Sequence, residues 1–315
     1  GGKQDIPNRA KRHFHVMNVP LPGAASIAQI FGSMVRVHFP DQHADGEAAV
    51  GEEVLTLSRR LVELTIAVWD AVKTKMLPTP SKFHYIFNLR DLSRVFQGVF
   101  TCPMGEVIQS EATLLQLWRH EATRVFQDRL IDDADKAWFD TCMEKVIEDR
   151  LGAAKGLHKL PKAYFVDFLR PAEEDPETGE EMPPPKVYEP VPDANFAVLR
   201  QVIGGYMERF KEVNKLHAVD LVLFDDALLH FMRISRIIRT PRGSALLVGV
   251  GGSGKQSLTR LASFIAESTI AQITLTKTYS ITNLLDDFKP MYRTAGVLNK
   301  SCSFIFTDKE IKEEE

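Results

Sequence analysis

The chain has 315 residues, of which 44% are hydrophobic and 26% charged, and its 39 basic and 42 acidic side chains give a formal net charge of -3. This length predicts about two domains, each able to bury a core without a disulfide or a metal. The near-neutral charge excludes a polybasic protein that holds nucleic acid by bulk charge, and the ordinary apolar fraction excludes a mostly disordered chain.

Three cysteines, Cys102, Cys142 and Cys302, are too widely spaced for a zinc knuckle or a disulfide framework, which fits a reducing compartment. No apolar run approaches the roughly 18 residues of a membrane span, so we expect no membrane partner. The ends, Gly1 and Glu315, resemble cut ends. We therefore expect a segment of a longer protein.

The first half of the chain is predicted to be almost entirely helical after a short half-buried strand over 13–18. Ser26 is a candidate N-cap for a short helix. The clearest helix follows, because apolar residues recur at steps of three and four along one face. These residues are Val54, Leu57, Leu61, Leu64, Val68, Val72 and Met76.

Three further helices are predicted in this half. Asn88 is a candidate N-cap for a helix over 89–96, which Gly98 is expected to end. Amphipathic helices are predicted over about 106–130 and 134–151.

Residues 171–192 differ in composition, since seven prolines stand there among acidic residues. We expect a linker that is too stiff and charged to pack, with a domain boundary near it; a long surface loop within one domain is the alternative. Helices and strands then alternate, which predicts an α/β fold with a parallel sheet. The expected helices are 194–214, 227–238, 254–266 and 281–292, and the expected strands are 245–248, 270–275 and 303–306.

The strongest motif is G-V-G-G-S-G-K-Q at 249–256, which fits the first seven positions of the phosphate loop G-x-x-x-x-G-K-[ST]. Glycines let the backbone wrap an anion closely, and the N–H groups at a helix N-terminus favour negative charge. The lysine then reaches the β- and γ-phosphates. The predicted phosphate-binding residues are Gly249, Val250, Gly251, Gly252, Ser253, Gly254, Lys255, Gln256 and Ser257.

The motif departs from the pattern where a Ser or Thr hydroxyl normally binds Mg²⁺, because Gln256 stands there. Ser257, one residue later, is rotated by about 100° on a helix. We therefore predict weakened or water-mediated magnesium coordination. The apolar strand 303–306 leads to Asp308, the predicted metal-shell carboxylate; in the other register Thr307 takes that position and Asp308 stands where the water-activating Glu usually is.

Residues 223–227, 233–236 and 241–261 resemble the fourth AAA+ module of a dynein heavy chain, and F-I-F-T-D-K-E-I-K-E-E at 304–314 resembles its Walker B region in axonemal chains. Residues 1–18 resemble the end of the third module's core, with Arg12 at the arginine-finger position. Residues 83–94 resemble its lid, with Arg90 at the sensor 2 position.

This resemblance implies a helical AAA+ lid followed by a P-loop AAA+ parallel-sheet core, both modules being incomplete. Residues 1–25 then end the third module's large subdomain and 26–165 form its lid. Residues 166–193 are the linker, and 194–315 are the nucleotide-binding core of the fourth module.

The resemblance also implies the activity and the partners. The family couples ATP hydrolysis to minus-end-directed movement on microtubules in the cytoskeleton, here in the ciliary axoneme. The implied cofactors are ATP or ADP with Mg²⁺, and the implied partners are the other AAA+ modules, microtubules, and dynein intermediate and light chains. Arg12 would act in trans on the preceding module, and Arg90 would sense nucleotide in the third.

We expect the 315-residue chain to bind nucleotide with little turnover. One alternative is a structural or regulatory module whose nucleotide is never hydrolysed, which Gln256 and the lack of an adjacent Asp-Glu pair favour. A second is another AAA+ machine that acts on DNA. The chain lacks the basic, aromatic-interleaved groove that this needs, so we expect no nucleic-acid partner.

Overall fold

A computed structural model describes residues 6–41, 50–174, 181–192, 196–213, 221–276 and 278–311. The chain forms two compact units. The first comprises Gly1–Phe165 and Val187–Pro190, and the second comprises Val166–Lys186 and Val191–Glu315. Among the described helices, none combines the length and the apolar character that crossing a membrane requires.

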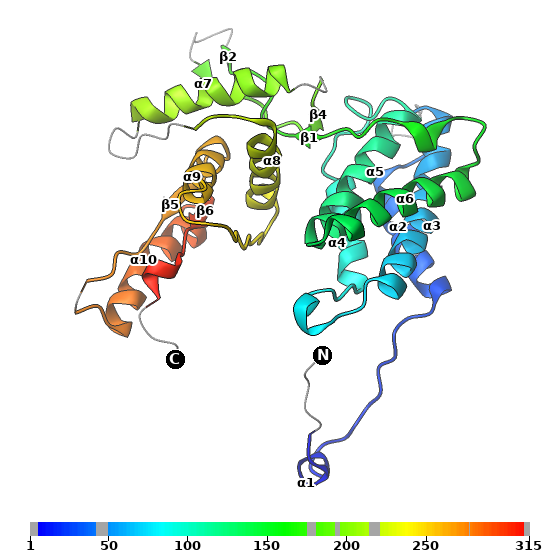
Figure 1. Cartoon of the computed structure of the whole chain (residues 1–315), viewed down its shortest axis with the longest axis horizontal. Coiled ribbons are helices and arrows are strands. Elements are labelled where there is room, and N and C mark those ends of the chain that lie inside the picture. The colour runs from blue at the N-terminus through cyan, green and yellow to red at the C-terminus, as the bar shows by residue number, and fades with distance from the viewer. Residues whose placement is uncertain are drawn as a thin grey trace. The chain divides into compact units, whose positions relative to one another are not determined.

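The first unit is helical (Figure 1). A short two-stranded sheet pairs β1 with β4. The elements are α1 (Asn8–Lys11), α2 (Ala24–His38), α3 (Glu52–Lys75), η1 (Pro80–Lys82), α4 (Leu89–Val99), α5 (Glu111–Phe126), η2 (Gln127–Arg129), α6 (Asp133–Leu151), η3 (Leu157–Lys159), β1 (Phe165–Val166) and β4 (Glu189–Pro190).

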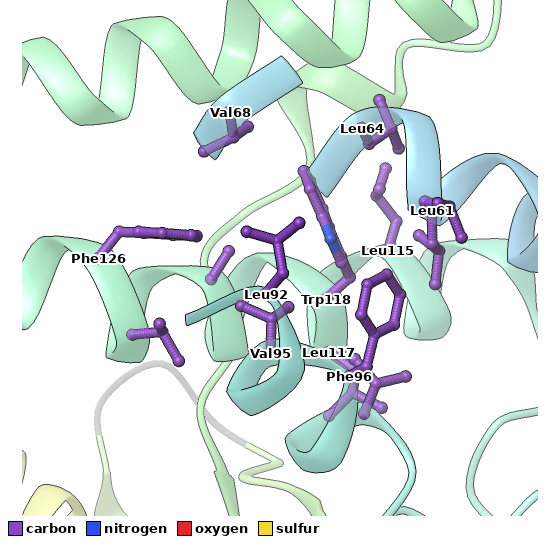
Figure 2. Packing of buried hydrophobic residues seen from close by; sticks show 14 of the residues in the cluster. Leu61, Leu64, Val68, Leu92, Val95, Phe96, Leu115, Leu117, Trp118 and Phe126 are labelled. Atoms are coloured by element: carbon purple, nitrogen blue, oxygen red, sulfur yellow. The ribbon is translucent and has the colours of Figure 1, made fainter. Parts of the chain in front are cut away.

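The core of this unit is built around the predicted stripe of α3, all seven residues of which are buried. Figure 2 shows α3 side chains packed with Leu92 and Phe96 of α4 and with Trp118 of α5. The indole Nε1 of the fully buried Trp118 donates a 2.8 Å hydrogen bond to Thr65 Oγ1. The polar atom of the Trp118 side chain is therefore satisfied.

Helix boundaries follow the caps in some places and not in others. Asn88 caps α4 as predicted, since its side chain accepts from the Arg90 N–H while the Asp91 carboxylate accepts from the Asn88 N–H. In contrast, α2 begins after Gly23 rather than at Ser26, and α5 begins after Ser110 instead of near residue 106.

Gly98 does not end α4, so that prediction is wrong. The helix continues to Val99 and buries Gly98 against the carboxylate of Glu121 on α5. A β-carbon at this position would stand 1.9 Å from Glu121 Oε2. The glycine is there because two helices approach closely, not because the helix stops.

The strand predicted over 13–18 is also absent. This segment is exposed and forms no strand, and Phe14, Val16 and Met17 face solvent. A strand is stable only when a neighbour takes up its backbone hydrogen bonds. Within the described residues no strand pairs with this segment.

The second unit joins helices to two short parallel strands, so it is the α/β part of the fold (Figure 1). β5 pairs in parallel with β6, with Thr269 opposite Cys302 and Ala271 opposite Phe304, and α9 packs on α8, α7 and β5. The elements are β2 (Glu173–Glu174), β3 (Glu181–Met182), α7 (Ala197–Val213), α8 (Asp225–Arg239), α9 (Lys255–Ile265), β5 (Thr269–Ala271), α10 (Ile281–Gly296), β6 (Cys302–Phe304) and η5 (Asp308–Glu310).

Residues 245–248 do not form the predicted buried strand. They have no regular structure, and Leu246 and Val248 are 90% and 87% exposed. A strand buried on both faces needs covering elements and ladder partners. In the described part of the sheet, β5 and β6 pair only with each other.

The prediction that 171–192 is too charged to pack is wrong at its described end. Tyr188 is buried in the first unit, and its hydroxyl donates a 2.7 Å hydrogen bond to Glu121 Oε1. In the second unit, Lys186 donates to the Ile265 carbonyl at 2.9 Å. Residues 175–180 of this predicted linker, and residues 193–195 just after it, lie outside the part of the chain that the structure describes.

We expect Gly98→Ala to destabilise the chain by about 1–3 kcal/mol, because the added methyl group overpacks the contact with Glu121. Gly32→Ala in α2 is the control, since a β-carbon there meets nothing within 4 Å. This substitution should stabilise the folded chain by about 0.5–1 kcal/mol, because alanine loses less conformational entropy on folding than glycine does. Denaturant unfolding measures both changes, and equal effects would refute the close approach.

Candidate functional site

The predicted phosphate loop leads into α9 as expected. Gly252 and Gly254 both have φ of +78°, the left-handed conformation that favours glycine, and Gly254 is the residue before the first turn of α9. The free N–H groups at the start of a helix point toward such a loop. Residues 249–254 thus have the backbone that a phosphate cradle needs.

Lys255 lies inside the turn of this loop. Its Nζ donates to the carbonyl oxygens of Gly249 and Val250, at 2.8 and 2.7 Å, and to Ser253 Oγ at 3.0 Å. Phosphate oxygens are acceptors of the same kind, so the ammonium group can exchange the loop's oxygens for them. The lysine is therefore placed to contact whatever anion the loop holds.

Gln256 and Ser257 occupy the first turn of α9. Gln256 is exposed and Ser257 half-buried, and in the described ranges neither side chain makes a hydrogen bond. Thr259, one turn after Lys255, donates its hydroxyl to the Lys255 carbonyl at 2.8 Å. The groups open to a ligand near the metal position are thus an amide and a hydroxyl.

The Asp308 side chain lies just past β6, on the first residue of the turn η5. It is exposed, and no hydrogen bond or ion pair to it is found among the described residues. Within 6–311, apart from the undescribed stretches, no three His, Cys, Asp or Glu side chains gather as a metal site. A site that offers a single carboxylate, Asp308, suits a Mg²⁺ ion whose other ligands are phosphate oxygens and water.

Glu310, two residues later, is bonded at both carboxylate oxygens. Oε2 accepts from the Thr307 N–H, and Oε1 accepts from Gln272 Nε2 at 2.8 Å. Burial raises the pKa of Glu310, but the hydrogen bonds from Thr307 and Gln272 outweigh it and hold the pKa below its usual value. Glu310 was not among the residues predicted from the sequence, although Thr-x-x-Glu has capping-box spacing.

Gln272 connects this turn to α9. It directly follows β5, and its Oε1 accepts from Arg260 of α9. Parallel strands end at the same edge of a sheet, so the residues after β5 and β6 lie along one edge. Ligands of α/β proteins bind outside this edge, where Asp308 is found.

Leu221 is a second residue that the sequence did not single out. A β-carbon at Gly254 would lie 3.4 Å from Leu221 Cδ2, so this leucine packs beside the loop. Arg200 of α7 fixes the segment, because its Nε donates to the Leu223 carbonyl at 3.2 Å and its guanidinium pairs with Asp225. The loop therefore has an apolar side chain at its border.

Arg12 and Arg90 belong to the first unit, whereas the phosphate loop and Asp308 belong to the second. Arg12 follows α1, is exposed, and donates from Nε to His13 Nε2 at 3.1 Å. Arg90 is an exposed residue of the first turn of α4. No ion pair to its side chain is found in the described ranges.

Asp91 does not pair with its neighbour Arg90. The Asp91 side chain is 2% exposed, and its Oδ1 lies 2.9 Å from Arg129 Nη2 and 3.4 Å from Arg94 Nη1. Arg129 also stacks on Phe87 and donates to the carbonyls of Ile86 and Val125. This arrangement fixes the turn before α4 and leaves Arg90 pointing to solvent.

Two family models match the chain. The one described as "P-loop containing dynein motor region D4" matches residues 219–315, and the one described as "AAA+ lid domain" matches residues 61–153. The lid match lies in the first unit and the P-loop match in the second.

Several relatives align over the whole chain. Mouse dynein axonemal heavy chain 5 is 48% identical, human dynein axonemal heavy chain 8 is 47%, and the flagellar outer-arm dynein gamma chain of Chlamydomonas reinhardtii is 43%. The chain belongs to the axonemal dynein heavy chains. It spans an AAA+ lid and the D4 P-loop motor region of that family, and about 7% of the length of each of these three relatives.

We expect Arg129→Met to destabilise the dynein segment by about 1–3 kcal/mol, because it leaves the buried Asp91 carboxylate without its main partner. Arg94→Met is the matched control, since Arg94 pairs with the same oxygen from a side chain that is 59% exposed. The stability lost in Arg94→Met should stay within about 0.5 kcal/mol. Denaturant unfolding compares the two variants, and equal losses would show that Asp91 depends no more on Arg129 than on Arg94.

Proposed function

We propose that this chain is a nucleotide-binding segment of a dynein motor ring and holds ATP or ADP at residues 249–257. The observation that carries the proposal is the loop itself. Two glycines in the left-handed region precede α9, and Lys255 Nζ lies within the turn. The match to a P-loop motor region over 219–315 supports the same assignment.

In this proposal the loop backbone and the first turn of α9 bind the phosphates, and Lys255 contacts their β and γ oxygens. Leu221 borders the loop and contacts the nucleoside. Asp308 serves the magnesium shell, with Gln256 or Ser257 acting weakly or through water; Thr307 is the alternative residue at the Walker B position. Mg²⁺ itself would neutralise phosphate charge.

The domain assignment extends from this site. Residues 1–25 end the large subdomain of the third module, 26–165 form its lid, 166–193 link the modules, and 194–315 form the core of the fourth. The lid match over 61–153 supports the second of these. Arg12 acts in trans as an arginine finger on the preceding module, and Arg90 senses nucleotide in the third.

The intact protein is proposed to be an ATP-driven motor that moves toward microtubule minus ends in the ciliary axoneme. Its partners are then the remaining AAA+ modules of the same heavy chain, microtubules, and dynein intermediate and light chains. The names of the relatives support this, since they are axonemal or flagellar dynein chains.

The alternative is a structural or regulatory module that keeps its nucleotide. Gln256 at the usual hydroxyl position favours it, as does the absence of an adjacent Asp-Glu pair at Asp308. A carboxylate that lacks such a neighbour positions water poorly. Slow exchange of bound nucleotide without turnover in an intact ring would support this alternative over the hydrolysing site.

We expect Lys255→Ala to abolish ATP and ADP binding to the 315-residue chain, because it removes the only lysine within the loop. Titration calorimetry measures the affinity. Lys300→Ala is the control, since Lys300 is an exposed lysine outside the loop of the same unit, and its affinity should match the wild type. Retained binding in Lys255→Ala would refute the proposed site.

We also expect the 315-residue chain to hydrolyse ATP with a kcat at least about a hundredfold below the roughly 1–100 s⁻¹ that is typical of kinases. The reason is that Asp308 has no adjacent Glu to position the attacking water. A steady-state phosphate-release assay, with Asp308→Asn as the background, tests this. Turnover within the usual range would contradict it.

A further inference from the structure

A chain of three polar side chains joins the helix after the phosphate loop to the turn that carries Asp308. Arg260 of α9 donates to Gln272 Oε1, and Gln272 Nε2 donates to Glu310 Oε1 at 2.8 Å. All three side chains are half-buried. They come from three separate elements of the second unit, namely α9, the end of β5 and η5.

The two ends fix the direction of this chain. Arginine can only donate and an ionised glutamate can only accept, so the Gln272 amide has one allowed orientation. Its oxygen must face Arg260 and its NH₂ group must face Glu310. Hydrogen bonds to charged groups are the stronger ones, which makes this connection stiffer than a contact between neutral groups.

The two carboxylates at this edge are used differently. Glu310 has no free oxygen, because the Thr307 N–H occupies Oε2 while Gln272 occupies Oε1. Asp308, two residues earlier, is exposed, and its side chain makes no hydrogen bond or ion pair within the described part of the chain. Glu310 therefore suits holding the turn, and Asp308 suits holding a ligand.

We propose that Glu310 is a positioning residue that fixes the turn η5 to α9 and so directs Asp308 toward the magnesium of the bound nucleotide. The inference deepens the proposed function and rests on it. Lys255 and Arg260 share α9, so the helix that holds the phosphates also sets, through Gln272 and Glu310, the place of the metal-shell carboxylate. Outer-shell partners of this kind orient the groups that bind metals.

The test measures ADP affinity of the 315-residue chain with and without MgCl₂. The readout is the gain in affinity that magnesium gives. In Glu310→Gln one acceptor oxygen becomes an NH₂ group, which then faces either the Gln272 NH₂ group or the Thr307 N–H, so one hydrogen bond is lost in each orientation. In Gln272→Glu two carboxylates face each other. In each variant, the gain in ADP affinity that magnesium gives should be about tenfold smaller than in the wild type, or absent if the wild-type gain is itself below tenfold. The ADP affinity without magnesium should stay within about twofold of the wild-type value.

The double variant Gln272→Glu with Glu310→Gln exchanges the amide and the carboxylate and so restores the series of hydrogen bonds from Arg260 to position 310. Arg260 and the amide introduced at position 310 then both donate to the carboxylate introduced at position 272. The oxygen of the introduced amide accepts from the Thr307 N–H, and the net charge equals that of the wild type. We expect the magnesium gain to return to within about twofold of the wild-type gain.

Glu212→Gln is the matched control, because Glu212 is an exposed residue of α7 and the substitution removes the same charge. It should leave the magnesium gain unchanged. The inference is overturned if the single variants keep the full gain, if they lose affinity equally with and without magnesium, or if the double variant is no better than they are. It is also overturned if the wild type binds ADP with no magnesium gain.

These outcomes differ from failure of the proposed function. If the wild-type chain binds no ADP at all, the nucleotide site itself is wrong and the role of Glu310 falls with it. If the wild type binds ADP and magnesium strengthens that binding, only the result for the variants decides whether Glu310 positions Asp308.

Discussion

The fully buried carboxylate of Glu121 is the constraint around which the first unit is arranged. A buried charge is tolerated only when its hydrogen bonds are satisfied, and here Arg124 supplies one partner and the Tyr188 hydroxyl another. The space for the carboxylate exists because Gly98 has no side chain. Thus α4, α5 and the returning segment 187–190 meet at one acidic group, although they are far apart in the sequence.

The second unit depends on a different constraint, the position of charged groups at one edge of a short parallel sheet. α9 begins at Lys255, and its Arg260 is bonded to the residue that follows β5. The turn after β6 is bonded to the same Gln272. The loop that fits phosphates and the carboxylate that fits a cation are therefore carried by elements that a single side chain connects.

The features that could be predicted from the sequence are those that depend on neighbours in the chain. Helix α3 was predictable because its apolar residues recur with helical spacing, and the loop before α9 because its glycines and Lys255 form a contiguous motif. Gly98 was misread because glycine suits both a helix end and a close approach, and only the distant Glu121 decides between them. The strands over 13–18 and 245–248 failed for a related reason, since a strand exists only with a partner. Glu310 has a visible capping-box spacing, but Gln272 and Arg260 come from other segments, so its network had no local signal.

The path of the chain between the two units has a practical consequence for dissecting this protein. Residues 166–186 belong to the second unit, and 187–190 return to the first before the chain leaves again. A cut after Phe165 removes Tyr188 from Glu121, and a cut after Pro190 removes Phe168 from its packing against Phe231. No single cut in the sequence yields two complete units, because each unit includes a segment that lies beyond the first residues of the other.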